Sequence, residues 1–139
     1  ITAILAAPPH WQWDLTTSRR TPREVLPQLP QHPRLHLHPY PQADSAWVAA
    51  RLQQCHSVWV SPDSVSMVYE AVTAGAAVGL LALPGQRPTR VANGLKLLQQ
   101  QHGITPFAAW EQGQALSPSP TPLFEAERCA HWIIQQWLP

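Results

Sequence analysis

Residues 57–84, SVWVSPDSVSMVYEAVTAGAAVGLLALP, decide the fold because they predict a strand, a turn, a helix and a second strand. The apolar runs at 57–60 and 77–83 have the length and composition of strands buried in a parallel sheet. A proline and an aspartate mark the turn, and Gly75 stands where a helix commonly ends in the left-handed conformation. The stretch therefore predicts one βαβ unit.

The predicted helix has an apolar face and a polar face. At about 100° per residue, the first carries Val65, Val68, Tyr69 and Val72, and the second carries Asp63, Ser66 and Glu70. We expect the apolar face to pack on a sheet, and Asp63 or Ser64 to cap the helix by accepting from its first free amides. Because the helix follows the carboxyl end of a parallel strand, its N–H groups and positive dipole end face the crevice where open α/β sheets bind ligands.

This geometry predicts a phosphate site at the start of the helix. The hydroxyls of Ser64 and Ser66 can donate to a phosphate, and Glu70, one turn deeper, can accept from a ribose diol. A plainer interpretation fits the same residues: Ser64 only caps the helix, and Ser66 and Glu70 are solvated. Spacing alone leaves both interpretations open.

The rest of the chain alternates predicted strands with predicted helices. Strand patterns occupy 11–17, 34–38 and 104–107. Helices are predicted over 89–102 and over 123–138. Two more are predicted, one after a capping box at Thr21-Pro22-Arg23-Glu24 and one after a cap at Asp44 or Ser45. This order predicts an α/β fold, a three-layer sandwich around a mostly parallel sheet. Since neither G-x-G-x-x-G nor G-x-x-x-x-G-K-[ST] occurs, we expect a Rossmann-like domain that holds phosphates without those glycines.

Composition excludes several classes of function. A net charge of +1, with 12% charged residues among 139, excludes a broad electrostatic surface for nucleic acid. No run reaches the roughly 18 apolar residues of a membrane span, so no transmembrane segment is expected. Cys55 and Cys129 lack zinc-site spacing, and the chain does not need disulfides, which favours a reduced, cytoplasmic location.

The ends of the chain carry separate expectations. Residues 1–10, ITAILAAPPH, are expected to be a linker or the remnant of a missing N-terminal domain, since the chain starts at Ile rather than Met. Residues 11–139 are expected to form the Rossmann-like domain, which ends in an amphipathic helix. The apolar face of that helix consists of Ala126, Ala130, Ile133, Ile134 and Trp137, and it is broad enough to require a partner.

A second group of polar residues follows the first predicted strand. Ser18, Arg19 and Arg20 lie on the crevice side of a parallel sheet, and two guanidinium groups suit a diphosphate. A pair of solvated arginines explains the charge equally well. His36 and His38 share a strand face but lack a third ligand at a defined spacing, so we expect structural or solvated histidines and no metal or other cofactor.

Two motifs also resemble a known family. TTSRRTP (16–22) and DSVSMVYEA (63–71), with the intervening His38-Pro39-Tyr40, resemble the mitochondrial fission, or elongated-mitochondria, family, whose bacterial members are often labelled nucleoside-diphosphate-sugar epimerases. The resemblance implies the C-terminal half of a GT-B glycosyltransferase. It assigns Ser64 and Ser66 to phosphate, Glu70 to ribose, and Arg19 and Arg20 to charge neutralisation.

Two functions remain in competition at this point. In the first, the chain is the donor-binding half of a glycosyltransferase-like protein that binds a nucleotide-diphosphate sugar, needs its missing N-terminal domain and is inactive alone. In the second, as the family name implies, it is a non-catalytic interaction protein that recruits membrane-remodelling machinery through a surface including Trp132 and Trp137.

Overall fold

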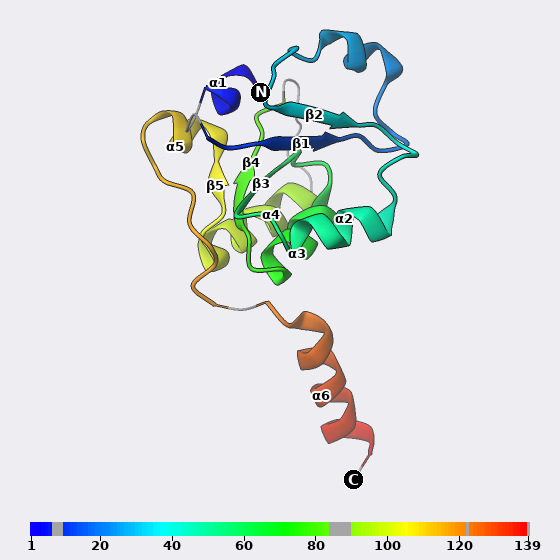
Figure 1. Cartoon of the computed structure of the whole chain (residues 1–139). Helices are drawn as coiled ribbons and strands as arrows, with labels where there is room; N and C mark the ends of the chain where they lie inside the picture. The colour runs from blue at the N-terminus through cyan, green and yellow to red at the C-terminus, as the bar shows by residue number, and fades with distance from the viewer. Residues whose placement is uncertain (7–9, 84–89, 122, 139) are drawn as a thin grey trace. The chain divides into compact units, whose positions relative to one another are not determined.

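The computed structural model describes residues 1–6, 10–83, 90–121 and 123–138, with the side chains of 90–93 left aside. Within them the chain forms two compact units, residues 1–49 and 50–139, each with its own parallel sheet (Figure 1). All three pairs of described strands are parallel, and helices alternate with them. The predicted α/β class with mostly parallel strands is confirmed.

The first unit is built on a pair of strands. It comprises α1 (Thr2–Leu5), β1 (Trp13–Thr16), the 3-10 helix η1 (Arg23–Gln28), β2 (Leu35–His38) and the beginning of α2 (Ser45–Leu52). β1 and β2 pair in parallel, with Trp13 opposite Leu35 and Thr16 opposite His38. The strands predicted at 11–17 and 34–38 are therefore confirmed, with slightly shorter limits.

Side chains tie the two strands and α1 together. The two histidines predicted to be structural or solvated lie beside polar groups, with 3.2 Å between His36 Nε2 and Gln12 Oε1 and 2.9 Å between His38 Nε2 and Asp14 Oδ1. Arg34 donates to the carbonyl oxygen of Leu5 at 2.6 Å, and Leu5 itself is buried. The beginning of the chain is thereby anchored to the first unit.

The second unit contains the predicted βαβ unit. It comprises β3 (Ser57–Val60), α3 (Val65–Thr73), β4 (Ala77–Leu80), α4 (Arg90–His102), β5 (Thr105–Pro106), α5 (Phe107–Glu111) and α6 (Glu125–Trp137). The strand order is β3-β4-β5, and all four residues of the central strand β4 are buried. The βαβ prediction is confirmed, whereas the strand predicted over 104–107 ends earlier because Phe107 begins a helix.

One face of α3 packs into the core of this unit. Val68 and Val72 are buried as predicted, but Tyr69 is 39% exposed, and Ala71 is fully buried instead. Val68, Ala71 and Val72 form the buried stripe at i, i+3 and i+4, and Tyr69, about 100° around the helix from Val68, lies beside it. The inclusion of Tyr69 in the packed face was therefore wrong, while the polar residues Ser66 and Glu70 are exposed as predicted.

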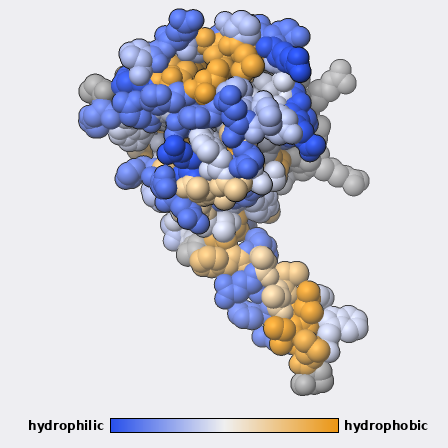
Figure 2. All heavy atoms as spheres, turned by 45° about the vertical axis from the view of Figure 1, so that its right-hand side comes forward, coloured by the Kyte–Doolittle hydropathy of each residue, from blue (hydrophilic) through white to orange (hydrophobic). Residues whose placement is uncertain are grey.

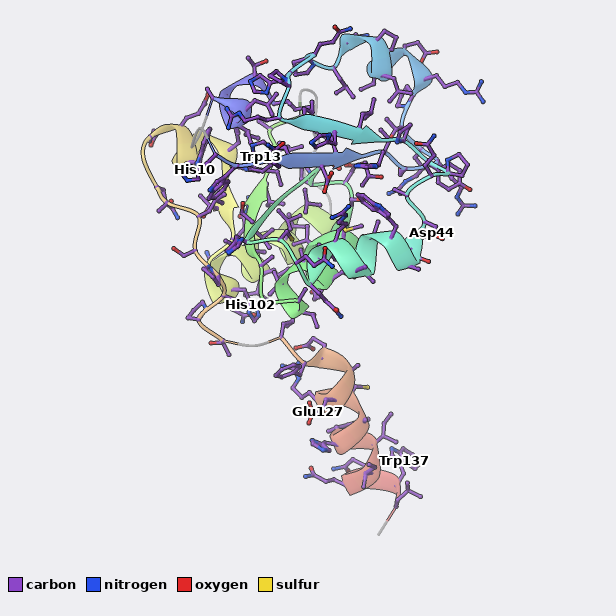
Figure 3. The ribbon with its side chains drawn as sticks, in the orientation of Figure 1. His10, Trp13, Asp44, His102, Glu127 and Trp137 are labelled. Atoms are coloured by element: carbon purple, nitrogen blue, oxygen red, sulfur yellow. The ribbon has the colours of Figure 1, made fainter. Side chains whose placement is uncertain are left out.

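The helix ends confirm some predicted caps and correct others. Asp44 lies at the start of α2 (Figure 3), and its Oδ1 accepts from the backbone N–H of Trp47 at 2.8 Å, so this cap is confirmed. Gly75 has φ +82°, which confirms the left-handed end of α3. Ser64 occupies the N-cap position of α3, but its side chain makes no capping hydrogen bond.

The capping box predicted at Thr21 is wrong. η1 begins at Arg23, no side chain caps it, and Thr21 Oγ1 instead accepts from the backbone N–H of Ser18 at 3.0 Å. Pro27 lies inside the helix, where its ring clashes with the carbonyl of residue i−4 in an α-helix and its missing N–H removes one backbone bond, so the helix stays short.

α6 is the strongly amphipathic helix predicted near the end of the chain. Figure 2 shows apolar side chains gathered along it, and Figure 3 marks Glu127 and Trp137 on it. The large apolar residues of α6 and its two ends are exposed, namely Phe124, Trp132, Ile133, Ile134, Trp137 and Leu138.

Candidate functional site

An open hollow lies at the carboxyl ends of the two strands of the first unit. It has a volume of about 530 Å³ and is lined by Thr17, Ser18, Arg19, Thr21, Arg23, Leu26, Tyr40 and Pro41. We call it the strand-end hollow. Because β1 and β2 are parallel, the segments that follow them leave the sheet at the same edge, where α/β proteins place ligands. Its volume lies within the roughly 300–1,000 Å³ of small-molecule sites.

Hydroxyl groups join the two segments that form the hollow. Thr17 Oγ1, directly after β1, accepts from the backbone N–H of Tyr40 after β2 at 3.1 Å. Within the first segment, Ser18 Oγ accepts from the N–H of Arg20 at 3.1 Å, and Thr21 Oγ1 accepts from the N–H of Ser18. Ser18 Oγ and Thr21 Oγ1 also lie 3.4 Å apart, so one of them can donate to the other while the remaining hydroxyl proton and that of Thr17 can be donated to an anion.

The charge of the strand-end hollow is positive. Arg19 and Arg23 line it and are exposed, and none of its eight lining residues is acidic. Among the described residues, neither arginine forms an ion pair. Each guanidinium presents several N–H donors in a planar fork that matches phosphate oxygens. The hollow therefore combines positive charge with hydroxyl donors, which is the chemistry that holds a phosphate group.

The six residues predicted from the sequence fall into two sets. In the first unit, Ser18 and Arg19 line the hollow, and Arg20 is exposed in the same segment without lining it. In the second unit, Ser64 is half-buried at the N-cap of α3, and the exposed side chains Ser66 and Glu70 follow along the helix, one turn apart.

Sequence reasoning missed several residues of the hollow. No ligand-binding role was predicted for Thr17 or Thr21, and Arg23, Leu26 and Pro41 were not considered as residues of the site. The available signal was position, because these residues lie in the segments that directly follow β1 and β2 or begin the next helix. Using that signal required knowledge that the two strands pair side by side.

Other kinds of chemistry have less support in the described part of the chain. No group of three His, Cys, Asp or Glu residues there is arranged to hold a metal ion. Burial raises the pKa of the Cys55 thiol, and its Sγ lies 3.4 Å from the carbonyl oxygen of Leu52, so this thiol is a poor nucleophile near neutral pH. Among the described helices, none has the length and apolar character needed to cross a membrane.

The family model for mitochondrial fission ELM1 matches residues 1–137. The chain belongs to this family. The match includes both motifs that carried the resemblance, TTSRRTP at 16–22 and DSVSMVYEA at 63–71. In this ELM1-family chain the first motif forms much of the strand-end hollow, and the second begins just before α3 and runs along most of it. No significant match was found among curated proteins or among solved structures.

Proposed function

We propose that this chain binds the nucleotide-diphosphate part of a nucleotide sugar, as the donor half of a GT-B glycosyltransferase-like protein that is inactive alone. The observation that carries the proposal is the strand-end hollow, in which Arg19 and Arg23 lie at the carboxyl edge of a parallel strand pair without an acidic neighbour in the lining. A diphosphate is the ligand group that best matches two guanidinium forks and several hydroxyls.

The residues of α3, in the second unit, form a separate candidate site that is argued from this helix alone. Ser64 lies at the N-terminus of the helix, where free N–H groups and the helix dipole favour an anion, and its hydroxyl makes no capping bond. Ser66 and Glu70 extend this polar face into solvent. On this helix we propose Ser64 and Ser66 as phosphate-binding residues and Glu70 as a ribose-binding residue, independently of the strand-end hollow.

In a transferase, these groups would stabilise the departing diphosphate. Guanidinium groups and helix amides act where negative charge develops, and they need no proton transfer of their own. The candidate residues include no general base for an acceptor, so we expect binding without turnover from this chain.

The test is a calorimetric titration of the chain with UDP, GDP, CDP, ADP and dTDP. We expect at least one nucleoside diphosphate to bind, and Arg19→Ala to weaken it by about 10- to 150-fold, because charge-assisted hydrogen bonds contribute roughly 1.5–3 kcal/mol. Arg128→Ala is the matched control, since this arginine is exposed on α6 and pairs with Glu125. Absence of binding, or equal loss in both variants, would contradict the proposal.

A separate variant tests the ribose assignment. Glu70→Ala should weaken nucleoside diphosphates more than inorganic pyrophosphate, which has no ribose, while Glu127→Ala on α6 should change neither. Equal affinities of Glu70→Ala and the unmodified chain for every nucleotide would remove Glu70 from the site.

A non-catalytic interaction protein is the second candidate, and the exposed apolar face of α6 favours it. Trp132 is 57% exposed and Trp137 is 73% exposed, and large aromatic side chains are common anchors of protein interfaces. This candidate predicts no nucleotide affinity, together with capture of a protein partner that is lost in Trp132→Ala and Trp137→Ala. Capture that persists in both variants would count against this surface.

A further inference from the structure

The strand-end hollow has two chemically different sides. Arg19, Arg23 and three hydroxyl-bearing residues provide charge and donors, whereas Leu26, Tyr40 and Pro41 provide apolar and aromatic surface. A site for a bare anion needs only the first side. The second side indicates a ligand in which an anionic group is joined to a ring.

We propose that Tyr40 stacks against the base of a nucleoside diphosphate whose phosphates bind Arg19 and Arg23, so that Tyr40 contributes to a preference for a nucleotide over a bare diphosphate. This inference rests on the proposed function and assigns the ring of the ligand to the same hollow.

The backbone holds Tyr40 close to the cationic segment. Its N–H donates to Thr17 Oγ1 at 3.1 Å, and Thr17 is only two residues before Arg19. Proline on either side of Tyr40 restricts the backbone of this segment. Less conformational freedom is therefore lost when a ligand orders the tyrosine.

The ring of Tyr40 is available for stacking. The residue is 48% exposed and lines the hollow, and no ring contact with another aromatic side chain is found for it among the described residues. A base is flat and has two π-faces, so it can cover the phenol ring while its phosphates reach the guanidinium groups. Stacking of a base on an aromatic side chain is sequence-tolerant, so Tyr40 by itself favours any nucleotide over a bare diphosphate.

The experiment compares the dissociation constants of inorganic pyrophosphate and of the nucleoside diphosphate that binds most tightly. In the unmodified chain we expect the nucleotide to bind more tightly, and Tyr40→Ala to reduce this ratio by about five- to 150-fold, the range for loss of one base–aromatic stack. Tyr40→Phe keeps the ring and should preserve the ratio. Trp137→Ala is the control, because Trp137 is an exposed aromatic residue of α6 that neither lines the hollow nor belongs to the α3 residues proposed for binding.

The outcomes separate this inference from the proposed function. Suppose that Arg19→Ala weakens nucleotide binding but Tyr40→Ala leaves the ratio of the pyrophosphate and nucleotide dissociation constants unchanged. That result would overturn the stacking and leave the donor site intact. Equal losses in Tyr40→Phe and Tyr40→Ala would assign the effect to the hydroxyl and also overturn it. If neither pyrophosphate nor any nucleotide binds the unmodified chain, the donor site fails and the inference fails with it. Circular dichroism spectra of each variant confirm that it is folded.

Discussion

Replacing Gly79 by alanine tests how tightly the second unit is packed around its central strand. Gly79 lies on β4 directly opposite Trp59 of β3, and a Cβ added there would lie 2.5 Å from Cε3 and 2.7 Å from Cδ2 of the indole. Favourable contacts between carbon atoms are about 3.5–4.0 Å, so the ring would have to move by roughly 1 Å. The Trp59 ring therefore occupies the space that a side chain at position 79 would need.

The indole ring has neighbours that resist this movement. Its centroid lies 5.8 Å from that of Phe107 and 5.3 Å from that of Trp110, both in edge-to-face geometry. If the ring stays, the added methyl group overpacks the site at a cost of about 1–3 kcal/mol. If the ring moves, it gives up two aromatic pairs that contribute about 0.5–1.5 kcal/mol each, so the cost is similar. Alanine regains about 0.5–1 kcal/mol through lower backbone entropy in the unfolded chain, so the middle of the two ranges gives an expected net loss of about 1 kcal/mol.

The assay is urea unfolding followed by far-ultraviolet circular dichroism, with near-ultraviolet spectra to report on the tryptophans. Gly94→Ala is the matched control, because Gly94 lies in α4 with nothing within 4 Å of the added Cβ. Alanine in a helix interior should stabilise the chain by about 0.8–1 kcal/mol, the opposite sign. A third variant, Trp59→Leu, removes the indole and should abolish the cost of Gly79→Ala in the double variant.

Two results would refute this reasoning. One is a Gly79→Ala chain as stable as the unmodified one. The other is an equal loss in the Trp59→Leu background, which would show that the cost comes from the backbone of β4 and not from the indole ring.

Two further predictions concern single side chains. Asp44→Ala removes the acceptor of the Trp47 N–H and should lower the unfolding free energy by about 1 kcal/mol in the same urea assay, with Asp44→Asn keeping most of the stability; an unchanged midpoint for the alanine variant would exclude a capping contribution. Because burial raises the pKa of the Cys55 thiol, its thiolate fraction at a given pH is lowered, so iodoacetamide should modify the exposed Cys129 first at pH 8 and reach Cys55 only at higher pH. Mass spectrometry of timed samples measures both rates, and faster modification of Cys55 would contradict this order.

Much of the fold could be predicted because its signals are local. The two apolar runs around α3 form the paired strands β3 and β4, the period-two pattern at 11–17 forms β1, and Gly75 ends α3. Each of these signals acts within a few residues. The cap at Asp44 was predictable for the same reason, since the side chain reaches an N–H only three residues away.

The errors arose where a group had more than one possible partner. Thr21 has the sequence context of a cap, yet its hydroxyl accepts from Ser18 in the preceding turn. Tyr69 has a helical spacing that fits an apolar face of Val65, Val68 and Val72, but the buried face is centred on Val68, Ala71 and Val72, because the direction in which the helix meets its neighbours sets which stripe is covered.

For the candidate site, the sequence by itself determined which side-chain types were available, and the tertiary structure decided which of those residues lie together. A motif of hydroxyls and arginines after β1 was evident from residues 16–22, and it places the chain in the ELM1 family together with the motif of α3. That Tyr40 and Pro41 line the same hollow as Arg19 follows only from the parallel pairing of β1 with β2. Pairing between strands that lie some 20 residues apart depends on which apolar surfaces can be buried together, and no short window of sequence contains that information.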